Sequence, residues 1–81
     1  MNILYFAWVR ERIGLPREKV ETTARNVAEL VDELRAREER YAVAFSDLAG
    51  LRVAVDQQLT DFDASLEGVR EVAFFPPMTG G

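Results

Sequence analysis

The two most apolar, β-favouring segments of this chain lie near its opposite ends. Asn2–Val9 is almost continuously apolar, aromatic or β-branched, and Val72–Phe75 has the same character. Runs of this kind are typical of central strands that are covered, at least in part, on both faces. Because the rest of the chain connects them, the two strands can lie side by side and parallel. We therefore predict a sheet with the first and last strands in its middle.

The clearest helix signal runs from Asn26 to about Arg40. Asn26 is a favourable N-cap residue, and Glu29 three positions later completes a capping-box-like pair. The apolar residues that follow recur at helical spacing and form one stripe. Further apolar residues between Tyr41 and Leu48 indicate a second, short helix. The stripe consists of Val27, Leu30, Val31 and Leu34.

The remaining segments predict turns and short strands. Arg10–Pro16 is polar and contains Gly and Pro, so we expect a turn there. Arg17–Thr22 is typical of a charged edge strand, and Leu51–Asp56 alternates as a half-buried strand does. Leu59–Thr60 adds a brief fifth pairing segment. The predicted fold is α+β: a mixed four- to five-stranded sheet packed on one main helix.

The composition excludes several classes of function. The chain has 81 residues and contains neither Cys nor His, so it cannot build a disulfide, a zinc site of the usual ligands or a His-based catalytic pair. Its net charge of −4 argues against nucleic acid or an anionic membrane as the main partner. No apolar run approaches the ~20 residues that span a bilayer. We expect a cytoplasmic protein that binds no metal and acts through partner proteins.

One face of the predicted sheet has no helix to cover it. If Val72 and Phe74 face the helix, Phe75 points to the other side, where Phe6 and Leu59 can join it. An exposed apolar patch of this kind usually marks an interface. The alternative is that loops cover both faces and that Phe6 belongs to the core. We favour the interface, because so short a chain has little left to cover a second face.

The chain ends in a segment without bulky side chains after two prolines. Proline has no N–H to donate, so the pair ends the last strand and favours an extended exit. We expect residues 1–75 to form the domain and residues 76–81 a flexible tail that presents the Gly81 carboxylate. The ordinary alternative is a chain terminus without function. The tail reads Pro76, Pro77, Met78, Thr79, Gly80 and Gly81.

The ending Glu71–Gly81 resembles that of the small, sulfur-carrier subunit of molybdopterin synthase. The opening Leu4–Glu11 resembles that family's first strand and turn, and Val53–Gln57 its third strand, although the family often has asparagine where Asp56 stands. The turn Glu67–Val72 departs further, because its glycine is displaced and acidic residues are missing. The resemblance covers the whole chain.

This resemblance implies a ubiquitin-like β-grasp fold and a part in sulfur transfer. An adenylyltransferase similar to ubiquitin-activating enzymes would use ATP and Mg²⁺ to convert the Gly81 carboxylate into an acyl-adenylate, and a sulfur donor protein would convert it into a thiocarboxylate. The tail would then enter the large catalytic subunit and give sulfur to cyclic pyranopterin monophosphate in molybdenum cofactor biosynthesis. The chain itself would bind no cofactor and would not be catalytic alone. The synthase would be a heterotetramer.

The resemblance also assigns roles to residues. Gly81 would be the activated residue, and Gly80 its slim neighbour in a narrow channel where a Cβ would clash. A docking patch would be shared by both partners, with Arg10 at its rim. The predicted partner-binding residues are Phe6, Leu59, Phe75, Pro76, Pro77, Met78, Thr79 and Arg10.

Three other functions fit the same features. The chain could carry sulfur for thiazole or another sulfur-containing product. It could be a ubiquitin-like modifier whose terminal carboxylate is joined to lysines of other proteins. It could also be a β-grasp interaction domain with an inert tail.

Overall fold

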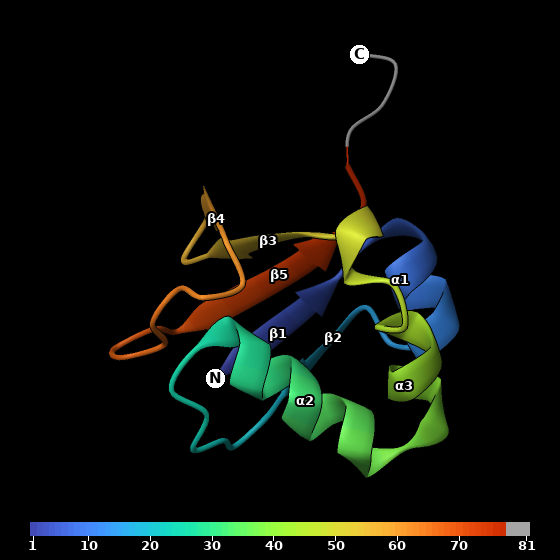
Figure 1. Ribbon diagram of the computed structural model, residues 1–81, viewed down its shortest axis with the longest axis horizontal. Helices are drawn as coiled ribbons and strands as arrows, with labels where there is room; N and C mark the ends of the chain where they lie inside the picture. The colour runs from blue at the N-terminus through green and yellow to red at the C-terminus, as the bar shows by residue number, and fades with distance from the viewer. Residues whose placement is uncertain (78–81) are drawn as a thin grey trace.

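The computed structural model describes residues 1–77, which form one mixed sheet with helices against it (Figure 1). The strand order is β2-β1-β5-β3-β4. β1 and β5 pair in parallel at the centre, and every other pair is antiparallel, which confirms the predicted central pair. The strands are β1 Asn2–Tyr5, β2 Arg17–Lys19, β3 Arg52–Val55, β4 Gln58–Thr60 and β5 Glu71–Phe75.

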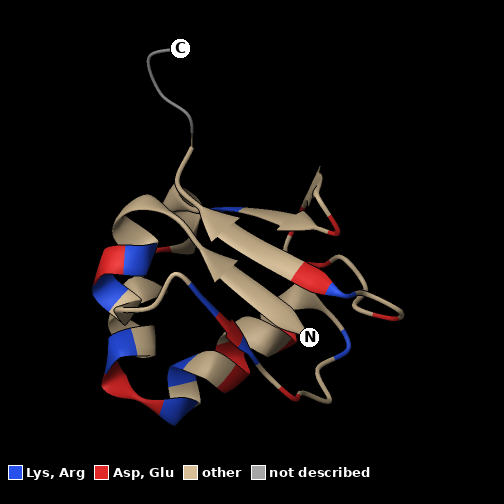
Figure 2. Cartoon of the chain, turned by 180° about the vertical axis from the view of Figure 1, so that it is seen from behind, with Lys and Arg blue, Asp and Glu red and all other residues tan. Residues whose placement is uncertain are grey.

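The helices leave one face of the sheet open. Figure 1 shows α2 and α3 in front of the strands, and Figure 2, from behind, shows the central strands with no helix before them. The predicted α+β architecture with one main helix, α2, is confirmed, and two short α-helices accompany it. The helical elements are α1 Ala7–Ile13, α2 Val27–Arg37, α3 Glu39–Ala44 and the 3₁₀ turn η1 Leu48–Gly50.

The start of α2 forms as its sequence predicts. The side-chain oxygen Oδ1 of Asn26 accepts a hydrogen bond from the N–H of Glu29 at 2.8 Å. The Glu29 carboxylate reaches back to the N–H of Arg25 at 3.3 Å, one residue before the expected Asn26. All four residues of the predicted apolar stripe are buried, so α2 packs this stripe against the sheet.

The core lies between the sheet and the helices. Strand residues Ile3, Tyr5 and Phe74 are almost fully buried. The Phe74 ring stacks near Tyr5, with centroids 6.3 Å apart, and meets the Phe45 ring edge-on at 5.0 Å. Such aromatic pairs add stabilisation beyond the area they bury. β5, the strand that leads to the tail, therefore packs on aromatic rings of the core and also pairs with a strand on each side.

The segment after β1 is where the prediction is wrong. β1 ends at Tyr5 rather than Val9, and most of the expected turn over Arg10–Pro16 belongs to α1. The backbone turns at Ala7, whose φ of 53° lies in the left-handed region that a side chain disfavours. Val9 and Ile13 then bury themselves one helical turn apart. The apolar run contained both a strand and the start of an amphipathic helix.

A carboxylate ties the edge strand β2 to the helical layer. Glu18 Oε2 accepts hydrogen bonds from the hydroxyl groups of Tyr5 and Tyr41, at 2.8 and 2.6 Å. Burial, followed by the hydrogen bond to Glu18, raises the pKa of both tyrosines, that of Tyr41 to about 12. Both hydroxyls therefore stay protonated and keep donating to Glu18 above pH 10, where a free tyrosine ionises.

Candidate functional site

The strand register places a row of uncharged side chains across the sheet face that the helices leave uncovered, which we call the open face. Leu4, Ala73, Ala54 and Leu59 are successive partners on β1, β5, β3 and β4. Register partners point to the same side of a sheet, so all four belong to one face. The two alanines keep the middle of this row flat.

Two phenylalanines extend this row at the end of the sheet where the tail begins. Phe6 is extended and its N–H donates to the Phe74 carbonyl oxygen at 3.1 Å, so it continues the alternation of β1 onto the open face. Its side chain is 44% exposed, and Phe75 is half-buried. Val72 and Phe74 are fully buried toward the helices, as predicted.

Three of the predicted partner-binding residues, Phe6, Leu59 and Phe75, therefore share one face, although they do not form one tight cluster. Leu59, which is 70% exposed, lies two strands from β5, about 10 Å across the sheet. The small residues between it and Phe75 bridge this gap. Whether partners dock there stays a prediction. We call the surface formed by Leu4, Phe6, Ala54, Leu59, Ala73 and Phe75 the apolar patch.

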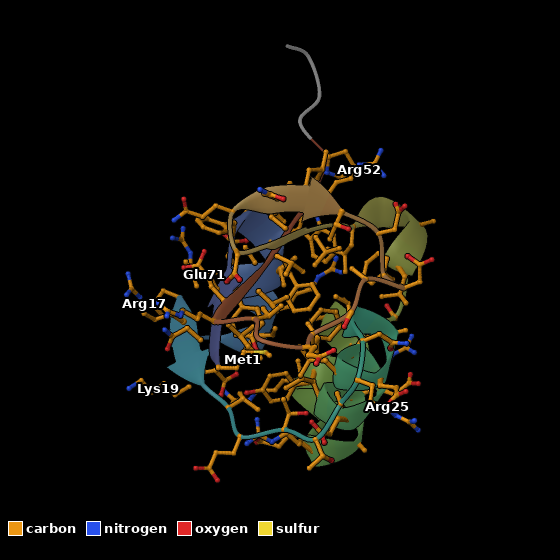
Figure 3. All side chains as sticks on the ribbon, turned by 90° about the vertical axis from the view of Figure 1, so that its left-hand side faces the viewer. Met1, Arg17, Lys19, Arg25, Arg52 and Glu71 are labelled. Atoms are coloured by element: carbon orange, nitrogen blue, oxygen red, sulfur yellow. The ribbon has the colours of Figure 1, made fainter. Side chains whose placement is uncertain are left out.

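The root of the tail is half-buried at the end of β5. Pro76 and Pro77 follow Phe75 directly, and Phe75 pairs with Arg52 at the start of β3. Figure 3 shows Arg52 beside the point where the chain leaves the sheet. Met78, Thr79, Gly80 and Gly81 lie outside the described residues. Their predicted roles, and the division into a domain over 1–75 and a flexible tail over 76–81, stay predictions.

Arg10 does not lie in the turn that the sequence predicts. It is an exposed residue of α1, and its carbonyl oxygen accepts the N–H of Gly14 at 2.7 Å. Gly14 ends the helix with a φ of 90°, which glycine adopts without strain. The predicted rim contact therefore has a helical position, and its role stays a prediction.

A hollow of about 450 Å³ lies next to the apolar patch, between η1 and β4. Leu59 belongs to both the hollow and the patch, and Arg52 and Asp61 add charges of opposite sign. The remaining lining residues are Leu48, Ala49, Leu51, Val53, Thr60 and Phe62.

Two other features are absent from the described part of the chain. Within residues 1–77, no group of three or more potential ligand side chains is arranged to hold a metal ion. None of the helices in this range is long and apolar enough to cross a membrane.

Sequence reasoning missed the charged residues that frame the apolar patch. Arg17 and Lys19 pair with Leu4 and Asn2, and Arg52 pairs with Phe75, so all three belong to the open face. The period-2 alternation of the strands was a usable signal, but only the register shows which neighbours they frame.

A five-stranded mixed sheet with a parallel central pair and one main helix defines this protein as an α+β domain of the β-grasp, ubiquitin-like class. SAMP1 from Haloferax volcanii has this fold, with a TM-score of 0.77 at 21% identity over 100% of this chain and 98% of that one. A Pyrococcus furiosus protein described as subunit 1 of a molybdopterin converting factor superposes with a TM-score of 0.70 at 23% identity, covering 95% of each chain.

The chain belongs to the ThiS family, whose model matches residues 3–81. It is 41% identical to the molybdopterin synthase sulfur carrier subunit of Escherichia coli K12 over 81 residues, covering 100% of this chain and 99% of that protein. The subunit of the same name from Mycobacterium tuberculosis is 35% identical over 83 residues, covering 100% of this chain and 96% of that protein. The predicted family resemblance is thereby confirmed.

Proposed function

We propose that this protein is the sulfur-carrier subunit of a molybdopterin synthase. The observation that carries this proposal is the full-length similarity to relatives of that name, at up to 41% identity. The site supports it, because an uncovered apolar patch ends at the strand from which the Gly-Gly tail departs. A carrier needs both a surface that partners recognise and a slim reactive terminus.

The chemistry follows from the reactivity of a terminal carboxylate. A free carboxylate is a poor acyl donor, so an adenylating partner uses ATP and Mg²⁺ to attach AMP to the Gly81 carboxylate, with release of pyrophosphate. A sulfur donor then displaces AMP and leaves a thiocarboxylate. The absence of Cys and His from the chain fits this division of labour, because the catalytic groups belong to the partners.

The large catalytic subunit is the proposed acceptor of the loaded tail. Docking through the apolar patch would hold the Gly81 sulfur close to cyclic pyranopterin monophosphate, and such positioning replaces a collision in solution by a reaction at high effective concentration. Gly80 and Gly81 would pass through a channel too narrow for a Cβ. We place this relay in the cytoplasm and expect two carriers to bind two large subunits.

The names of the relatives favour this function over the alternatives. All three are molybdopterin synthase subunits, which favours that acceptor over thiazole or another sulfur-containing product. The likeness to SAMP1, at 21% identity, concerns the fold and does not favour protein modification. A ubiquitin-like modifier and an inert interaction domain therefore remain the alternative functions that an experiment must distinguish.

The test is the intact mass of the protein after incubation with ATP, Mg²⁺, the adenylating partner and a sulfide source. We expect a mass gain that matches one oxygen replaced by one sulfur, and no gain in a variant that lacks Gly81. No gain from a partner proven active on another carrier would refute the carrier function. Conjugates to lysines of other proteins, without transfer of sulfur to the pterin, would favour a modifier.

A further inference from the structure

Three cations frame the apolar patch on the open face. Arg17 and Lys19 lie on the edge strand β2, and Arg52 lies at the start of β3, at the end of the sheet where the tail leaves (Figure 3). All three side chains are exposed. Figure 2 shows the same face from behind: the two central strands are uncharged except for the acidic start of β5 at Glu71, and charged segments lie around them. The patch thus has a positive charge at two separate corners.

These three residues are positively charged, whereas the protein as a whole has a negative net charge. The chain has fourteen Asp and Glu against ten Lys and Arg. Among the strand residues of the open face, Glu71 is the one acidic residue against three basic ones. Asp56, in the turn after β3, lies outside these strands, and its carboxylate accepts the N–H groups of Arg70 and Glu71, both at 3.0 Å. The open face is therefore locally positive on an acidic protein.

The three cations, like Arg10 and Arg12 of α1, have no carboxylate partner within residues 1–77, unlike four other arginines of the helical side. Each of these four arginines lies within 4.0 Å of a carboxylate, whereas no such contact involves Arg17, Lys19 or Arg52 within residues 1–77. A partner that covers the patch would desolvate these free charges, and that is costly unless it supplies opposite charges. The paired arginines are Arg25, Arg35, Arg37 and Arg40.

We infer that the partner covering the open face presents carboxylates at two places, one opposite Arg17 and Lys19 and one opposite Arg52, around an apolar centre. This inference rests on the proposed function, and the partner we assign is the large subunit of the synthase. Apolar contacts alone leave the rotation of two flat surfaces poorly defined. Charges at two corners fix this rotation, and they direct the root of the tail toward one point of the partner.

Two other occupants fit the open face less well. A second copy of this chain would bring the same three cations into one isologous interface, where like charges oppose association. Nucleic acid binding gains its affinity from many phosphate contacts, whereas this face offers three cations around an apolar centre on an acidic chain. Both occupants can be recognised in the experiment below.

The experiment measures association of the full-length protein with the large subunit at several salt concentrations. Arg17→Glu, Lys19→Glu and Arg52→Glu are each compared with Arg25→Glu, which changes the net charge equally. Arg25 lies on the side of α2 and its side chain is 88% exposed (Figure 3). At low salt we expect each open-face reversal to slow association by about three- to tenfold, and Arg25→Glu by less than about twofold. The difference should shrink as salt screens the charges.

The outcomes separate the inference from the function on which it rests. Binding of the wild-type protein, with open-face variants no slower than Arg25→Glu, overturns the inference and leaves the carrier function standing. If the wild-type protein does not bind the large subunit, the proposed function itself fails. Dimers of the free protein that the reversals dissociate, or binding of a single-stranded oligonucleotide that they abolish, also overturn the inference. Unchanged melting temperatures show that the variants are folded.

Discussion

Tyr5 and Tyr41 donate hydrogen bonds from their hydroxyl groups to Glu18. From these two bonds we predict that the protein loses stability above pH 10. Burial and the hydrogen bond to Glu18 raise the pKa of Tyr41 from 10.0 to about 12 and raise that of Tyr5 as well. Above pH 10 the unfolded chain releases these protons while the folded chain retains them. The unfolded state then binds fewer protons, so the free energy of unfolding falls as pH rises.

The size of this loss follows from the number of protons. Each retained proton lowers the free energy of unfolding by about 1.4 kcal/mol per pH unit, so two tyrosines lower it by ~2.7 kcal/mol per unit above pH 10. The loss continues until the pH reaches the folded-state pKa, about 12 for Tyr41. Tyr41→Phe should roughly halve the slope. Because Tyr5 and Tyr41 are the two tyrosines of the chain, replacing both should remove this contribution.

The assay is urea unfolding at pH 7, 9, 10 and 11, followed by the fluorescence of Trp8, the single tryptophan. At pH 7, where both tyrosines are protonated in either state, Tyr41→Phe should cost about 1–2 kcal/mol for the lost hydrogen bond to a carboxylate. A slope above pH 10 that is the same in wild type and in Tyr41→Phe would refute the reasoning. Equal stability at pH 7 would show that the 2.6 Å bond contributes nothing.

Three further predictions concern the strained turn, the patch and the tail. Ala7→Gly should raise the free energy of unfolding by about 0.5–1 kcal/mol in urea, since glycine adopts its φ of 53° without strain; a loss of stability would contradict this. Phe75→Ala should weaken binding to the large subunit by about 1–3 kcal/mol in calorimetry, and unchanged affinity would remove it from the docking surface. Gly81→Leu should abolish the mass gain on sulfur loading at an unchanged melting temperature, because we expect the adenylating partner, like the large subunit, to admit the tail through a passage too narrow for a Cβ; normal loading would contradict a narrow passage in the adenylating partner.

The sequence predicts the centre of this fold well because several local signals agree there. The segment over β5 is β-favouring, two prolines end it, and the N-cap at Asn26 and the apolar stripe of α2 point the same way. The parallel pairing of β1 with β5 follows from their character and their places at the two ends of the chain. Agreement between propensity, pattern and capping is what makes such elements predictable.

The region around Ala7 was not predictable by the same means. Alanine rarely adopts a positive φ, and nothing in the local sequence marks the reversal. The spacing of Val9 and Ile13, with Gly14 after them, was the available helix signal, but the apolar run before it concealed the boundary. The position of Phe6 on the open face survived this error, because Phe6 precedes the turn.

The candidate site was predictable in its apolar part and not in its charges. We predicted that Phe6 and Leu59 are exposed because so short a chain has little left to cover a second sheet face. Both side chains are exposed in the structure. The frame formed by Arg17, Lys19 and Arg52 depends on which residues face each other across strands that are distant in sequence. Such register is a tertiary property, and the pattern of one strand does not contain it.

The place of β5 between two strands has a mechanical consequence. It is paired at four positions with β1 and at four with β3, and the tail continues from its end. A partner that grips the tail and pulls along it loads both sets of hydrogen bonds in shear, so they must break together rather than one after another. An edge strand would instead peel away from one side. The domain is therefore suited to being drawn by its terminus without unravelling.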